Sequence, residues 1–229
     1  MIELPKNDEQ SRYDYETGFH LTLQMDRLAK FIVHYEAYKM VMGLPGAIVE
    51  CGVFKGTSIC RFAMLRNLLG TDFSTKIIAF DVFSDDFPNT EYEEDQGQRE
   101  HWLQTAGGSS ISPEQLTEVF SWMNVSNYEL VAGDICETVP RYVEEHKGLK
   151  VALLNIDCDF VEPTYCALNN FYDRMVRGGI ILLDNYAGEG TAGHSYHGDT
   201  KGTDDFLKDH ELVVRKFPFA ARPCYIVKE

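Results

Sequence analysis

The sequence lacks long hydrophobic runs, paired cysteines and an N-terminal signal pattern, and each absence excludes a class of function. No run approaches the roughly 18 apolar residues of a membrane span, so we expect no membrane partner. The six cysteines form no C-x-x-C pair, which favours reduced thiols over a zinc site. The polar, acidic N-terminus lacks the basic start and apolar stretch of a signal peptide, and we expect a cytoplasmic protein.

Basic charge is also scarce, because 21 lysines and arginines face 36 acidic residues and leave a net charge of −15. This balance argues against nucleic acid as a partner, since a phosphate backbone is bound by a basic surface. The chain of 229 residues, 44% of them hydrophobic, is long enough for one large domain with a sizeable core.

Alternating strand and helix patterns predict a single doubly wound α/β domain with helices on both faces of a mostly parallel sheet. We expect strands at 47–52, 76–83, 128–133, 150–157 and 178–185, and helices at 57–69, 112–123, 137–146, 162–176 and 203–210. An antiparallel pair within 211–217 and 222–229 closes the sheet.

The N-terminal region is expected to extend this domain. Residues 1–18 are predicted to be an irregular arm and residues 19–43 a helix, so that 1–45 belong with the main body at 46–229. Two polar segments, 84–115 and 187–202, are expected to act as lids over the site.

The first strand–turn–helix unit reads E-C-G-V-F-K-G-T-S over residues 50–58. Glycines permit a sharp turn and close approach of a ligand, and a helix N-terminus offers free N–H groups. Asp81 ends the next strand, where a carboxylate accepts both hydroxyls of a ribose, and Asp134 follows the third strand within reach of an adenine edge. Together these features suit an adenosine-containing ligand.

Two acidic clusters follow buried strands in the C-terminal half. Asp157 and Asp159 end one strand, and Asp184-Asn185 ends another. In an open α/β sheet the carboxyl ends of strands bind ligands, and oxygen donors of this kind suit Mg²⁺ or another hard divalent cation. The alternative is that these are ordinary turn and helix-cap residues.

Taken in order, these pieces resemble the macrocin O-methyltransferase family of S-adenosylmethionine-dependent methyltransferases. The matching segments, spread over residues 45–186, are PGAIVECGVFKG, AFDVFSDDFP, VAGDICETVP, NIDCDFVEPT and ILLDNY. The chain departs from the family in DVFSDDFP, where members usually read D-S-F-E-G-L-P, and in its Asp-Asn pair, where Asp-Asp is common.

The resemblance implies a Rossmann-like fold and methyl transfer from S-adenosylmethionine to a hydroxyl of a sugar or sugar-like metabolite. It implies that Glu50, Gly52 and Ser58, beside Gly56, hold the methionine end of the cofactor, with Asp81 on the ribose and Asp134 against the adenine. It also implies that Asp157, Asp184 and Asn185 bind the metal and that Asp159 is the general base.

Two other classes stay open. An NAD-dependent sugar-nucleotide oxidoreductase is disfavoured because the first turn reads E-x-G-x-x-x-G rather than G-x-G-x-x-G. A non-catalytic nucleotide-binding module is disfavoured by the acidic clusters.

Several side chains have open roles. The histidines His101, His194 and His197 either contact the substrate or are plain loop residues. Arg12, Tyr13 and Tyr15 either line the acceptor pocket or pack in a homodimer contact.

Overall fold

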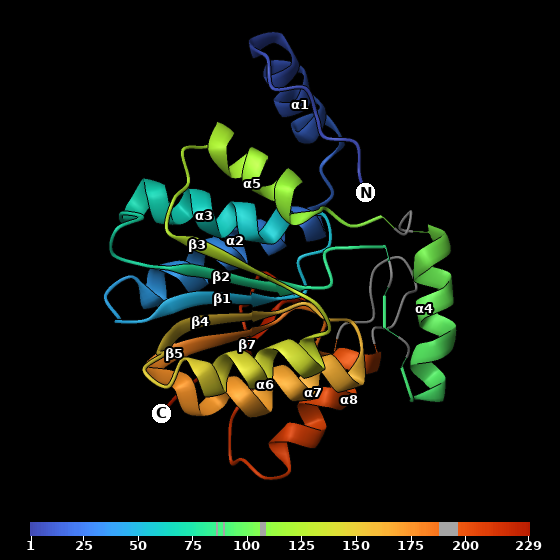
Figure 1. The fold of residues 1–229 in the computed structure, drawn as a ribbon, viewed down its shortest axis with the longest axis vertical. Coiled ribbons are helices and arrows are strands. Elements are labelled where there is room, and N and C mark those ends of the chain that lie inside the picture. The colour runs from blue at the N-terminus through green and yellow to red at the C-terminus, as the bar shows by residue number, and fades with distance from the viewer. Residues whose placement is uncertain (86, 89, 106–108, 188–196) are drawn as a thin grey trace.

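A computed structural model describes residues 1–85, 87–88, 90–105, 109–187 and 197–229 (Figure 1). In this part of the chain seven strands form one sheet in the order β3-β2-β1-β4-β5-β7-β6. The strands are β1 (Ala47–Cys51), β2 (Ile77–Asp81), β3 (Tyr128–Ala132), β4 (Val151–Ile156), β5 (Met175–Leu183), β6 (Arg215–Lys216) and β7 (Cys224–Val227). The first five are parallel to one another, and β7 pairs antiparallel with β5 and β6, which confirms the predicted fold class.

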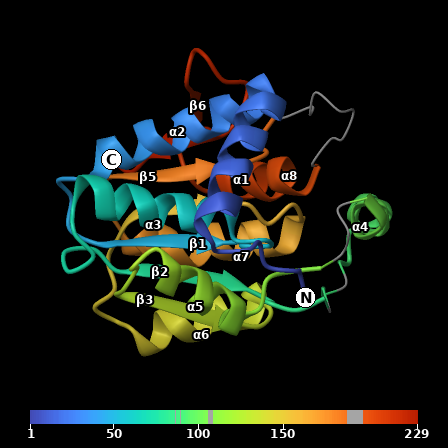
Figure 2. The same ribbon diagram turned by 90° about the horizontal axis from the view of Figure 1, so that it is seen from above.

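Helices cover both faces of the sheet, as Figures 1 and 2 show. The helices are α1 (Glu9–Thr22), α2 (Met25–Val41), α3 (Thr57–Leu69), α4 (Glu93–Thr105), α5 (Pro113–Trp122), α6 (Ile135–Glu145), α7 (Val161–Phe171), the short 3₁₀ helix η1 (Tyr172–Arg174) and α8 (His197–Leu207). Helices α2, α3 and α5 lie on one face, and α6, α7 and α8 lie on the other. No helix in the described part is long and apolar enough to cross a membrane.

The core consists of two apolar layers, one on each face of the sheet. One layer packs Val33, Phe62 and Leu116 against the strands, and the other packs Val139 and Leu168. Strands β1, β2 and β4 are buried along their whole length, which is why they read as continuous apolar runs rather than alternating ones.

The N-terminal prediction was wrong in its details. The predicted irregular arm contains α1, which is capped by Asp8 through a hydrogen bond from Ser11 N (2.9 Å). Helix α1 buries no residue and projects from the body in Figure 1, so no buried apolar face marks it in the sequence. The predicted helix at 19–43 is thus two helices, with the break before Met25.

Other boundaries also differ. The segment 84–115, predicted to be a polar lid, contains α4, which lies off the carboxyl edge of the sheet. Helix α8 begins at His197 rather than 203, and the helix expected to reach 176 changes to η1 after Phe171. Strand β6 has only two residues. Polar composition alone did not reveal α4, because it carries little apolar periodicity.

Arg66 of α3 links this helix to the loops that precede β2 and β3. It is fully buried, and its guanidinium donates to the carbonyl oxygens of Thr75 (2.9 Å), Ser126 (2.7 Å) and Asn127 (3.1 Å). These carbonyls belong to the loops that enter β2 and β3. Five fixed donors on one planar group explain why an arginine stands there.

We therefore expect Arg66→Met to lower the free energy of unfolding by about 2–4 kcal/mol, because the carbonyl oxygens of Thr75 and Ser126 lose the guanidinium and that of Asn127 keeps its hydrogen bond from Ile77 N. Urea unfolding measures the change. The control is Lys39→Met, since the Lys39 side chain is 44% exposed and contacts Glu36 and the Tyr35 ring on its own helix, and we expect a loss below about 1 kcal/mol. Equal losses in the two variants would contradict this role of Arg66.

Candidate active site

The two predicted acidic clusters lie side by side because β4 and β5 are neighbouring parallel strands that end at paired residues. Ile156 pairs with Leu183, so Asp157 and Asp184 are the next residues on adjacent strands. Their backbone N–H groups donate to Cys51 O (2.9 Å) and Ile156 O (3.0 Å), which extends the sheet by one residue at this edge. The sequence prediction that both clusters meet at the sheet edge is confirmed.

Asp159 reaches the same place by a turn rather than by an extended strand. Strand β4 ends at Ile156, and Asp159 has a positive φ of 65°. Asp159 therefore does not lie on an extended continuation of β4. Its carboxylate nevertheless turns back toward Asn185 and borders the same pocket as Asp157.

Asn185 lies at the centre of the acidic group. Its Nδ2 donates to Asp159 Oδ1 (2.7 Å) and Asp199 Oδ2 (3.1 Å) and lies 3.5 Å from Asp157 Oδ1. Its Oδ1 accepts a hydrogen bond from Arg222 Nη1. Because a guanidinium only donates, Arg222 fixes the amide with its nitrogen toward the carboxylates.

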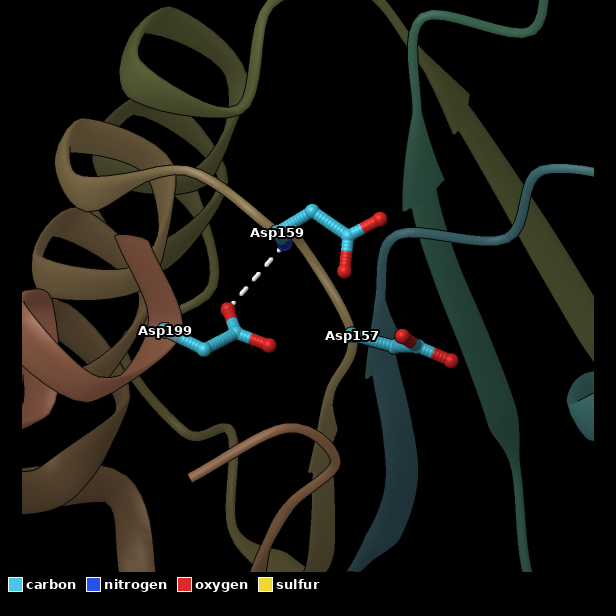
Figure 3. A group of neighbouring side chains, drawn as sticks. All are labelled: Asp157, Asp159 and Asp199. Atoms are coloured by element: carbon cyan, nitrogen blue, oxygen red, sulfur yellow. Dashed lines mark hydrogen bonds between the residues drawn. The ribbon is translucent and has the colours of Figure 1, made fainter. Parts of the chain in front are cut away.

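Asp199 is a member of this group that sequence reasoning did not select. It comes from the first turn of α8, is 2% exposed, and accepts hydrogen bonds on Oδ1 from Asp159 N (3.0 Å) and Thr164 Oγ1 (2.7 Å). Figure 3 shows it beside Asp157 and Asp159, and one oxygen from each lies within 4.8 Å of the others.

Two glycines allow α8 to approach the loop that carries Asp159. A Cβ on Gly198 would lie 2.4 Å from Asp159 O, and one on Gly202 would lie 2.7 Å from Val161 O. Either contact is shorter than real Cβ atoms make, so α8 can occupy this position only with glycine at both places. The position of Asp199 is thus fixed by close backbone packing.

Lys30 of α2 was also missed by sequence reasoning. Its Nζ lies 3.1 Å from Asp157 Oδ2 and 2.7 and 2.8 Å from the two oxygens of Asp184. Burial opposes the charged ammonium, but the two carboxylates outweigh it and raise the pKa of Lys30. The ammonium therefore stays charged and occupies both oxygens of Asp184.

The acidic group carries more negative charge than its protein partners neutralise. Burial first, and repulsion from Asp184 second, raise the pKa of Asp157 to about 6. Burial, followed by the neighbouring carboxylates, raises the pKa of Asp199 to about 7 and that of Asp159 well above its usual range. Asp184 is the exception: although burial opposes its charge, Lys30 lowers its pKa. Oxygen donors with uncompensated charge fit a divalent cation.

The glycine turn after β1 lies against the acidic group. Gly52 has a φ of 89°, and a Cβ there would lie 2.0 Å from Asp157 O, so only glycine fits. Glu50 is fully buried beneath the turn and accepts a hydrogen bond from Ser58 Oγ. Burial raises the pKa of Glu50 well above its usual range, although the Ser58 hydrogen bond counteracts it. Gly56, with a φ of 82°, forms the N-cap of α3.

Asp81 and Asp134 lie at the ends of β2 and β3, as predicted. Asp81 accepts three backbone hydrogen bonds, from Val53 N (2.6 Å), Phe54 N (2.9 Å) and Phe83 N (2.9 Å). Asp81 thus holds the backbone of the turn after β1 in place through Val53 N and Phe54 N. Asp134 is the N-cap of α6 and accepts from Cys136 N (2.8 Å).

A single pocket connects these elements along the carboxyl edge of the sheet. It runs from the ends of β2 and β3 past the glycine turn to the acidic group. Its lining residues include Gly52, Asp81, Asp134, Asp157 and Asp159, together with Phe54, Phe87, Thr90, Phe160 and Glu162.

The histidines and the N-terminal aromatics do not line this pocket in the described part of the chain. His101 lies on α4 and His197 begins α8, both exposed, while His194 falls outside the described residues. Arg12 contacts Asn7, and Tyr13 and Tyr15 are exposed on α1.

Residues 17–208 match the family described as Macrocin-O-methyltransferase (TylF). A curated relative from Streptomyces olivaceus, 8-demethyl-8-(2,3-dimethoxy-alpha-L-rhamnosyl)-tetracenomycin-C 4'-O-methyltransferase, is 28% identical over 162 residues. That match covers 68% of this chain but only 59% of the relative.

Solved structures share the fold across nearly the whole chain. The calicheamicin methyltransferase CalS11 matches with a TM-score of 0.70 at 22% identity, covering 96% of this chain and 87% of that one. The O-methyltransferase NovP matches with a TM-score of 0.68 at 18% identity, covering 87% of this chain and 79% of that one. At these identities the likeness establishes a common fold. Because the family match spans most of the sequence, the chain belongs to the macrocin O-methyltransferase family.

Proposed function

We propose that this protein transfers the methyl group of S-adenosylmethionine to a hydroxyl of a sugar or sugar-like small molecule. The observation that carries the proposal is the pocket that runs from Asp81 and Asp134 past the glycine turn to Asp157 and Asp159. A pocket that joins the proposed adenosine contacts to a proposed carboxylate base has the connection that transfer to a hydroxyl requires. Membership of the family supports the same reaction.

The proposed cofactor contacts follow the pocket. Asp81 would bind the ribose through Oδ1, which keeps a lone pair beside the hydrogen bond from Phe83 N, whereas Oδ2 already accepts from both Val53 N and Phe54 N. Asp134 would lie against the adenine. Gly52 lines the pocket and would contact the methionine end. Glu50, Gly56 and Ser58 are not among the lining residues, and the buried Glu50 would act on the ammonium and the sulfonium from beneath the turn.

A sugar is the favoured acceptor because of the relatives' activities. The Streptomyces olivaceus relative methylates a position of a rhamnosyl group, and CalS11 in its apo structure is described as a TDP-rhamnose 3'-O-methyltransferase (TM-score 0.65, 23% identity). A cytoplasmic location and a homodimer stay predictions from the sequence.

Asp159 is the proposed general base. When bound, the cofactor supplies the methyl group, which passes to the acceptor oxygen as the carbon–sulfur bond breaks and leaves S-adenosylhomocysteine. Asp159 takes the hydroxyl proton. It lines the pocket in which the acceptor hydroxyl would bind.

The segments 84–115 and 187–202 are proposed to exclude water from the site. In support, Thr90 Oγ1 and Glu91 N donate to Glu162 of α7 (2.9 and 2.6 Å), which holds the first of these segments over the pocket. Phe87 and Thr90 line the pocket itself. Water exclusion strengthens the interaction of Asp159 with the reacting hydroxyl.

A divalent cation, Mg²⁺ first of all, is proposed to assist Asp159. A bound ion lowers the pKa of the acceptor hydroxyl. Asp157 would be one of its ligands. The other two predicted ligands lie beside Asp157, but Asp184 contacts Lys30 and Asn185 contacts Arg222.

We expect Asp159→Asn to reduce the turnover of methyl transfer by about 10²- to 10⁴-fold, because an amide takes no proton. The dissociation constant of S-adenosylmethionine should stay within about threefold, since Asp159 does not hold the cofactor in this account. Transfer from radiolabelled S-adenosylmethionine to TDP-rhamnose and to rhamnosylated acceptors measures turnover, and calorimetry measures binding.

The control is Asp173→Asn, an exposed acid just after α7, which should leave both quantities unchanged. Full turnover in Asp159→Asn would assign the base elsewhere.

Calorimetry of the wild type with NAD⁺ serves as a second comparison. Binding of NAD⁺ without binding of S-adenosylmethionine would replace the methyltransferase by an oxidoreductase.

Removal of divalent cations should reduce turnover by about a hundredfold, since the hydroxyl would lose its activating charge. The protein is dialysed against EDTA, assayed, and assayed again after addition of Mg²⁺, which should restore the rate. Cofactor binding should be unaffected. An unchanged rate after dialysis would remove the metal from the mechanism and leave methyl transfer in place.

A further inference from the structure

We propose that Cys136 and Cys166 form a reversible disulfide on exposure to a peroxide, and that this bond weakens cofactor binding. The effect on binding rests on the proposed function, because Cys136 belongs to the pocket assigned to S-adenosylmethionine. All six cysteines are free thiols in this structure. Three observations single out this pair: the contact between the two thiols, the partial exposure of both, and a link from one of them to the pocket.

The two thiols meet where α6 packs against α7 (Figure 1). Cys136 lies in the first turn of α6 and Cys166 in the middle of α7, and their side chains hydrogen-bond to each other. Cys166 Sγ also lies 3.7 Å from the carbonyl oxygen of Ile135, the residue directly before Cys136. A disulfide forms only between cysteines whose side chains already approach each other, and this pair meets that condition.

The surroundings of the pair favour oxidation. Cys136 and Cys166 are half-buried, so a small peroxide can reach them, whereas Cys51 and Cys224 are buried. Asn170 Nδ2 donates to Cys166 Sγ (3.6 Å). The hydrogen bond from Cys136 lowers the pKa of the Cys166 thiol, although burial opposes it. Because thiolates attack peroxides faster than thiols do, Cys166 is the first nucleophile.

The reaction consumes one hydrogen peroxide for each pair. The Cys166 thiolate attacks a peroxide oxygen, the O–O bond breaks, and a sulfenic acid forms while the leaving hydroxide takes a proton and departs as water. Cys136 then attacks the sulfenic sulfur, so that the S–S bond forms, the S–O bond breaks, and the thiol proton leaves with the hydroxyl as a second water. Two electrons pass from the two thiols to the peroxide. A thiol reductant reverses the bond by exchange.

The pair is connected to the adenine end of the proposed cofactor site. Cys136 lines the pocket, and its backbone N–H donates to Asp134 Oδ1 (2.8 Å). Thr138 N donates to Asp134 O (2.8 Å), so the first turn of α6 holds Asp134 by two hydrogen bonds. Drawing the Cys136 side chain toward α7 therefore changes the pocket wall and the hydrogen bond that orients Asp134. The cofactor then binds less tightly to the oxidised protein.

Treatment of the full chain with hydrogen peroxide, followed by peptide mapping without reductant, tests the bond. We expect a peptide that joins Cys136 to Cys166 and disappears on addition of dithiothreitol. Calorimetry of the same samples should show that oxidation raises the dissociation constant of S-adenosylmethionine on the order of tenfold. Dithiothreitol should restore the original value.

Cys166→Ser should lose the response to peroxide. When reduced, this variant should bind the cofactor within about threefold of the wild type, since Cys166 is not among the residues that line the pocket. Cys60→Ser is the matched control, because Cys60 is also half-buried but lies on α3, and it should keep the full response. Thermal unfolding checks that each variant is folded. If Cys166→Ser is not, Cys136→Ser decides, by the ratio of its affinities before and after peroxide.

A peptide map without the Cys136–Cys166 link would overturn the proposal, and so would an equal loss of affinity in Cys166→Ser. A mapped disulfide that leaves the affinity unchanged would overturn its effect on binding. Reduced wild type that binds no S-adenosylmethionine would refute the proposed function and with it that effect, while the peptide map would still decide the disulfide.

Discussion

Four carboxylates at one edge of a sheet repel one another, and the site exists only where positive charge is brought to them. Lys30 comes from α2 near the N-terminus, and Arg222 comes from the segment before the last strand. Asp199 enters from α8 on the opposite face. The acidic site therefore joins parts of the chain that are far apart in sequence, and the binding edge depends on all three.

At the same edge, the glycine turn after β1 packs directly against the acidic group. Gly52 approaches the backbone of Asp157 so closely that the glycine turn and the acidic group are in direct contact. Asp81 fixes that turn from the neighbouring strand through three backbone N–H groups. A displacement of β4 against β1 would disturb the proposed cofactor site and the acidic group together.

The sequence was informative where structure is local. Helix α3 begins and ends at the predicted residues because a glycine turn and a change of period mark it, and the acids after β4 and β5 follow from two buried runs. Helix α4 has weak apolar periodicity and α1 buries no residue, so the sequence shows no apolar face that would predict either helix. Lys30 and Asp199 were missed because their roles depend on tertiary contacts across 127 and 40 residues, which no spacing encodes.

The most direct measurement is a crystal structure of the chain grown with S-adenosylhomocysteine and Mn²⁺, with the ion located by anomalous scattering. The account predicts the adenosine between Asp81 and Asp134, the sulfur beside the glycine turn, and Mn²⁺ next to Asp157 with Asp159 facing the open side. Adenosine bound outside this pocket, or a sulfur directed away from Asp159, would contradict methyl transfer at this site.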